Sequence, residues 1–208
     1  MRKLASVILK SEDARRELTS EDVAGLALVI SVAKRFAEDT RLCTYTCWVL
    51  SALASESAER KSYIRQHGGP NLCMTFLKTH VDDRLLHRHC YSSLFLMMEE
   101  NEECRRAVLE LNAHTLALQD MKRWQEDVEL HHLCCWMLYE VGCVMEESDP
   151  GLRDLIHMGE FVKTRHHQNE DVVIAAERLM KLCCSYPNLG CKSAVAALLR
   201  VGEAEGAL

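Results

Sequence analysis

Aromatic side chains are scarce in this sequence, where Phe, Trp and Tyr together make up 6% of the 208 residues. Apolar residues of all kinds still reach 48%. A core must therefore be built mainly from Leu, Ala, Val, Met and Cys, which favours closely packed helices over strands rich in aromatic and β-branched residues. The composition predicts an all-α protein.

Long hydrophobic runs are lacking as well. The longest apolar stretch without a charge runs from Val23 to Ala33, which is too short for a helix that spans a bilayer. The apolar run from Leu4 to Leu9 is also short, ends at Lys10 and has no convincing cleavage site, so it does not read as a signal peptide. We expect a soluble protein with no membrane partner.

An excess of positive charge is missing too, since the formal net charge is −6 and the isoelectric point is about 5.9. This argues against non-specific binding of nucleic acid or of anionic membranes. The cysteines number 11, an odd count, and lie inside apolar helical patterns such as Leu133-Cys134-Cys135-Trp136. They read as reduced core residues and not as a disulfide scaffold. We expect a cytoplasmic location, with the nucleus or a cilium also compatible.

Motifs of enzyme chemistry are absent from the sequence. No Gly-rich phosphate loop, nucleophile elbow or carboxylate pair follows a strand, because no convincing strand is present. His87 with Cys90 and His131 with Cys134 have the one-turn spacing of zinc ligands, but tightly spaced Cys-x-x-Cys pairs are missing. We predict no enzyme, no cofactor and no metal, with a His/Cys metalloprotein or Cys–His enzyme as the alternative.

What the sequence does contain is a repeating pattern. Long helices are predicted to follow Asp39, Asp82, Asp127 and Asp171, at steps of 43, 45 and 44 residues. Shorter helices follow, and Gly68, Gly159 and Gly202 are predicted to end one in each of three units. A period near 44 residues with three helices per unit indicates a solenoid, whose units bury their apolar faces on their neighbours.

The segment Cys47–Ser55 resembles the third-helix consensus of armadillo repeats, in which a Trp precedes small residues. Ile64–Gly69 resembles the end of the first armadillo helix, and Pro70–Leu77 resembles the second. The resemblance implies a right-handed α-solenoid of about four three-helix repeats. We expect one array over residues 1–208, with a partial repeat or cap at 1–38, units at 39–82, 83–126 and 127–170, and a last unit with tail at 171–208.

The resemblance also implies a binding groove. In the nuclear-import branch of the family, a third-helix Trp and an Asn four residues later line the concave face and clamp an extended basic peptide. Here the Trp-like positions are Trp48, Tyr91 and Trp136, and the Asn-like positions are Ala52, Phe95 and Glu140. The asparagine ladder is therefore missing. These six residues are the predicted partner-binding set, and the alternative is that the aromatic residues fill joints between repeats.

The predicted function is an adaptor or assembly subunit that binds a peptide segment or helix of another protein, basic segments included. Glu140 and the acidic turns Glu99–Glu103 and Glu146–Asp149 would select positive charge, although such turns are also typical of plain solvated loops. A structural subunit of a cytoskeletal or ciliary complex is the alternative. Both ends of the predicted array lack polar caps, so self-association through them is also expected.

Overall fold

The computed structural model describes residues 1–20, 25–55 and 57–186. Within these ranges the chain forms α-helices and no strand, which confirms the all-α class. The predicted helix 191–201 and Gly202 lie outside the described residues. The helices are α1 (Arg2–Lys10), α2 (Glu12–Leu18), α3 (Gly25–Arg35), α4 (Thr40–Ala54), α5 (Ala58–Gln66), α6 (Gly69–Thr79), α7 (Arg84–Met98), α8 (Glu102–Glu110), α9 (Ala113–Arg123), α10 (Val128–Gly142), α11 (Gly151–Arg165) and α12 (Glu170–Cys184).

The long helices α4, α7, α10 and α12 all begin at an Asp or Asn N-cap. In each, the side-chain oxygen of the cap accepts a hydrogen bond from the backbone N–H three residues later, at 2.9–3.1 Å. Such caps satisfy a backbone donor that the helix itself leaves unpaired. The caps are Asp39, Asp83, Asp127 and Asn169, at steps of 44, 44 and 42 residues.

Two of these caps differ from the predicted ones. Asp83 caps α7 in place of Asp82, and Asn169 caps α12 in place of Asp171. A shift of one residue turns a side chain by about 100° around the helix. The predicted alignment of α7 with α4 was therefore shifted by one residue, which changes the side chains of α7 that face the surface.

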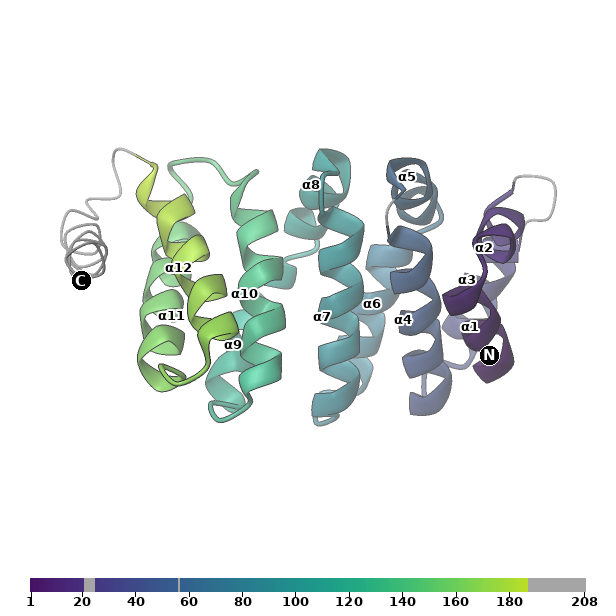
Figure 1. The fold of residues 1–208 in the computed structure, drawn as a ribbon, viewed down its shortest axis with the longest axis horizontal. Helices are drawn as coiled ribbons and strands as arrows, with labels where there is room; N and C mark the ends of the chain where they lie inside the picture. Colours follow the sequence, from purple (N-terminus) through teal and green to yellow (C-terminus); the bar gives the residue numbers. More distant parts are fainter. Residues whose placement is uncertain (21–24, 56, 187–208) are drawn as a thin grey trace, which may run out of the picture. The chain divides into compact units, whose positions relative to one another are not determined.

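The chain divides into two compact units, residues 1–116 and 117–208, and α9 contains the boundary. In the first unit, α4 packs between α1 and α7 (Figure 1). Helix α6 packs against α7 and α3, and α5 packs against α4, α6 and α8. The core of this unit is aliphatic and thiol-rich, and Tyr91 and Phe76 are its fully buried aromatic side chains. The predicted boundaries of the individual repeats remain predictions.

Two consecutive basic residues of α5 satisfy the ends of the two long helices in the first unit. Arg60 Nε donates to the carbonyl oxygen of Leu53 at 2.9 Å, close to the end of α4. Lys61 Nζ donates to the carbonyl oxygen of Glu99, the C-cap of α7, at 2.6 Å. Both basic residues are buried. They supply donors for carbonyl groups that have no partner within their own helices.

In the described part of the second unit, α12 packs against both α10 and α11 (Figure 1). The sequence predicted that Gly159 would end a short helix, but α11 continues through it to Arg165. Gly159 serves close packing, because a Cβ atom there would lie 2.6 Å from Met180 Cγ and 3.3 Å from the carbonyl oxygen of Ala176. Gly68, with φ of 82°, does adopt the left-handed conformation at the junction between α5 and α6.

Among the helices of the described ranges, none combines the length and the hydropathy that a bilayer crossing requires.

Candidate functional site

The first unit carries a groove on the face formed by α1, α4 and α7. Its volume is about 370 Å³, and its walls hold two exposed apolar side chains, Trp48 at 38% and Leu9 at 53% exposure. Ser51, His89 and Ser92 complete the lining. The groove therefore combines an aromatic and an aliphatic surface with hydroxyl and imidazole groups.

Trp48 is held in place by its neighbours. Its Nε1–H donates to Nδ1 of His89 on α7 at 3.3 Å, so that imidazole carries its own proton on Nε2. The Trp48 ring also packs edge-on against Tyr45, with centroids 5.4 Å apart, and against His89, with centroids 5.7 Å apart. A ring fixed in this way loses little conformational freedom when a partner covers it.

The floor of the groove lies where α4 and α7 approach each other. Ser51 Oγ on α4 is 2.9 Å from Ser93 Oγ on α7, and Ser93 Oγ also lies within hydrogen-bond distance of two carbonyl oxygens, that of Cys47 on α4 at 3.0 Å and that of His89 on α7 at 2.9 Å. Small side chains at this crossing let the two helices lie close together. The groove is therefore bounded by a joint that is tied by hydrogen bonds.

Tyr91 does not take the place that the sequence predicted for it. Counted from the N-caps, Tyr91 occupies the eighth position of its helix, which matches Cys47 and Cys135, and all three side chains are fully buried. The ninth position is accessible in each long helix and is held by Trp48, Ser92, Trp136 and Arg178. The prediction that Tyr91 faces a partner is corrected: it fills the interior, and Ser92 lines the groove.

The remaining predicted residues divide between surface and interior. Phe95 is partly exposed and matches Ser51 and Tyr139 when counted from the N-caps. Ala52 is buried at 8% exposure and Glu140 at 6%. A side chain that is so nearly covered offers little surface to a partner, so Glu140 is poorly placed to select its charge.

In the second unit, Trp136 belongs to an aromatic cluster. Its Nε1–H donates to Nε2 of His132 at 2.9 Å, and its ring lies edge-on to Tyr139. The guanidinium of Arg178 on α12 lies over both rings, 5.0 Å from the Trp136 centroid and 4.9 Å from that of Tyr139. This aromatic pair binds a planar cation within the chain.

The His/Cys pairs considered for zinc serve other roles. His87 Nε2 donates to the carbonyl oxygen of His80 at 3.1 Å, and His131 Nε2 donates to that of Met121 at 3.0 Å. Burial raises the pKa of both the Cys90 and the Cys134 thiols. In the part of the chain that the structure describes, no group of three or more His, Cys, Asp or Glu side chains is arranged to hold a metal ion.

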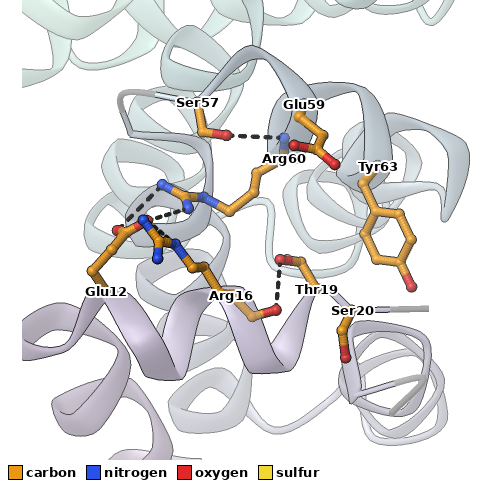
Figure 2. A pocket seen from close by; sticks show the side chains of 8 residues that line it. All are labelled: Glu12, Arg16, Thr19, Ser20, Ser57, Glu59, Arg60 and Tyr63. Atoms are coloured by element: carbon orange, nitrogen blue, oxygen red, sulfur yellow. Dashed lines mark hydrogen bonds and ion pairs between the residues drawn. The ribbon is translucent and has the colours of Figure 1, made fainter. Parts of the chain in front are cut away.

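A second, more polar pocket of about 560 Å³ lies between α2 and α5 (Figure 2). Arg60 and Glu12 meet there at 2.7 Å, and hydrogen bonds from Arg60 and Arg15 lower the pKa of Glu12 to about 2. The Thr19 hydroxyl donates to the backbone carbonyl of Arg15. The ion pair between Arg60 and Glu12 holds α2 against α5. Because these polar groups bind one another, we assign no ligand to this pocket.

No sequence pattern predicted this second pocket. Ser11 and Ser57, the N-caps of α2 and α5, are visible as capping residues, but nothing in the sequence pairs Glu12 with a residue 48 positions away.

Comparisons with known proteins show the fold and no family. No protein-family model and no curated protein matches this chain. Two crystal structures of engineered proteins from the Northeast Structural Genomics Consortium are similar. The first has a TM-score of 0.71 at 15% identity, over 88% of this chain and 71% of that one. The second has a TM-score of 0.73 at 17% identity, over 98% of this chain but 47% of that one, so this chain spans about half its length.

Proposed function

We propose that this chain is an armadillo-like helical protein without enzymatic activity, which binds a segment of another protein in the Trp48 groove. The armadillo assignment is supported by the order of helices, since a long helix, a short helix and a helix of intermediate length recur as α4-α5-α6 and α7-α8-α9. It is also supported by the N-caps of α4, α7 and α10, which follow one another at steps of 44 residues.

The observation that carries the binding proposal is the rigid, accessible ring of Trp48 beside an exposed Leu9. Tryptophan is enriched among the residues that dominate binding energy, because it buries a large area without losing many rotamers. A tryptophan with no partner would expose apolar surface to water at a cost. Its hydrogen bond to His89 leaves the indole face available while satisfying its polar atom.

The occupant that fits is an extended or helical segment with one large apolar side chain. That side chain would cover Trp48 and Leu9, while backbone polar groups meet the hydroxyls of Ser51 and Ser92. The net charge of −6 favours a segment with Lys or Arg around this anchor. Selection by the turn carboxylates is weaker than the sequence suggested, since Arg65 and Arg106 pair with Glu103 and Glu102.

The test is selection of peptides from a random library on the full chain, followed by titration of a selected peptide. Trp48→Ala should weaken binding by roughly 30-fold, equivalent to about 2 kcal/mol. Phe36→Ala is the matched control, because Phe36 is an exposed aromatic residue that does not line the groove. Equal affinity of the wild type and Trp48→Ala would contradict the proposal.

Self-association is a second candidate function, and exposed apolar side chains on the first helices favour it. Val7 on α1 and Leu28 on α3 are 52% and 66% exposed, so the first helices present apolar side chains. If a second copy covers them, sedimentation should show a dimer that Leu28→Glu converts to a monomer. A wild type that stays monomeric at high concentration would exclude this route.

A further inference from the structure

Three thiols meet in the core of the first unit. Cys47, Cys73 and Cys90 come from α4, α6 and α7, and each is completely buried. The Sγ atoms of Cys47 and Cys90 are 3.6 Å apart, in van der Waals contact. The sequence placed these cysteines in the core but did not indicate that two of them touch.

The helices that carry the touching pair are close at this point. The Ser93 hydroxyl oxygen lies 3.0 Å from the backbone carbonyl of Cys47 on α4 and 2.9 Å from that of His89 on α7, so both backbones lie within hydrogen-bond distance of one side-chain atom. A disulfide requires a sulfur–sulfur distance of about 2.0 Å. Side-chain rotation and a small approach of the helices would therefore bring the two sulfurs together.

We propose that Cys47 and Cys90 are a redox-active pair, which a hydroperoxide converts to a reversible disulfide between α4 and α7. One thiolate attacks a peroxide oxygen, the O–O bond breaks, and the sulfur becomes a sulfenic acid while the other oxygen leaves as water or an alcohol. The second sulfur attacks the first and expels water. The two thiols lose two electrons and two protons, and the hydroperoxide is reduced.

Cys73 is the third thiol of the cluster and differs from the other two in acidity. Hydrogen bonds from Cys47 and Cys90 lower the pKa of Cys73 to about 5. The hydrogen bond to Cys73 raises the pKa of Cys47, and burial raises that of Cys90. Cys73 is therefore the most acidic of the three thiols, and a crosslink that contains Cys73 is the product that competes with the proposed one. Because all three sulfurs are covered, the oxidant must wait for local opening, and oxidation should be slower than at the partly exposed Cys143.

The bond would form directly beneath the groove. Cys47 precedes Trp48 and Cys90 follows His89, so the same two helix turns carry the thiols and the hydrogen-bonded pair of the groove wall. Oxidation would fix the spacing of α4 and α7 there. The consequence for binding rests on the proposed function, whereas formation of the disulfide does not.

To test this, the reduced full chain is treated with hydrogen peroxide under native conditions. The remaining free thiols are then blocked, and tryptic peptides are mapped by mass spectrometry. The expected product is a crosslink of peptides 42–60 and 89–105, reversed by a thiol reductant. Fragment spectra must separate Cys47 from Cys43, and Cys90 from Cys104. Cys90→Ala should abolish the crosslink. Cys135→Ala, at another fully buried position, should retain it.

Mapping of the wild type decides the proposal even if Cys90→Ala fails to fold. A crosslink between other cysteines, or one that forms only in denaturant, would overturn it. Titration of a selected peptide against reduced and oxidised protein then tests the groove separately. An unchanged affinity with the crosslink in place would remove the link to binding and leave the redox pair standing.

Discussion

Nε2 of His166 lies 2.7 Å from Nδ1 of His131, whose own Nε2 donates to the carbonyl oxygen of Met121. In this series of hydrogen bonds His166 donates to Nδ1 of His131, so the His131 imidazole, which also donates from Nε2, is neutral. These two hydrogen bonds join the end of α9, the first turn of α10 and the residue after α11. Burial lowers the pKa of both histidines. The Asp127 carboxylate opposes this shift at both, and the Arg165 guanidinium adds to it at His166.

The first prediction is that acid destabilises the second unit through this pair. Because both folded-state pKa values lie below the unfolded value near 6.5, the unfolded chain binds more protons in this window. The stabilisation of the folded state by this neutral pair is complete above pH 6.5, and it is lost as the pH falls towards the lowered pKa values of the two histidines. Urea unfolding from pH 7.5 to 5 should show a falling free energy, with a smaller slope in His131→Phe.

His157→Ala is the control for this experiment, because His157 is an exposed imidazole on α11. Its slope should match that of the wild type. A His131→Phe variant with an unchanged slope would show that the pair does not govern the pH dependence.

The second prediction concerns Lys61, whose Nζ lies 2.6 Å from the carbonyl oxygen of Glu99. Lys61→Met keeps the aliphatic stem but leaves that carbonyl without its donor. We expect a loss of about 1–3 kcal/mol in the free energy of unfolding. Lys78→Met, at an exposed position of α6, should change it by less than about 0.5 kcal/mol. Equal effects of the two substitutions would mean that Lys61 does not stabilise the end of α7.

The third prediction concerns the contact of α11 with α12. Alanine at Gly159 gains about 1 kcal/mol in helix propensity. Its Cβ, however, would lie 2.6 Å from Met180 Cγ and 3.3 Å from a backbone oxygen, and crowding of this kind costs about 1–3 kcal/mol. We expect Gly159→Ala to lower the melting temperature. A higher melting temperature would show that Met180 moves aside without cost.

Sequence patterns predicted the long helices α4, α7 and α10 well, because their ends depend on local chemistry, whereas the two shorter helices predicted on either side of Gly159 are the single helix α11. An Asp oxygen that caps a backbone N–H three residues away, as Asp39 and Asp127 do, is encoded within a single turn. Gly68 was likewise predicted from local conformation. Gly159 was not, because its role depends on Met180 in a different helix.

The site was harder to predict for a related reason. Choosing Asp82 over Asp83 as the cap of α7 is a small error for helix boundaries, but it exchanges a buried position for an accessible one. Tyr91 was therefore predicted to face a partner, and Ser92 was missed. Trp48 was placed in the predicted partner-binding set because of a family resemblance. Its hydrogen bond with His89 was not predicted.

The fourth prediction tests this register. Tyr91→Ala removes a fully buried aromatic side chain and should cost about 3–5 kcal/mol of unfolding free energy. Ser92→Ala, one residue later on the accessible face, should cost less than about 0.5 kcal/mol. Equal effects measured by chemical denaturation would contradict the assignment of interior and surface on α7.

The binding proposal is tested most directly by the fluorescence of Trp48 itself. In a Trp124→Phe/Trp136→Phe variant, Trp48 is the remaining tryptophan, so its emission reports on the groove alone. A library-selected peptide should shift this emission to shorter wavelength and saturate with the dissociation constant found by calorimetry, because its apolar side chain covers the indole. A peptide that binds with the same affinity while the emission of Trp48 stays unchanged would contradict the account.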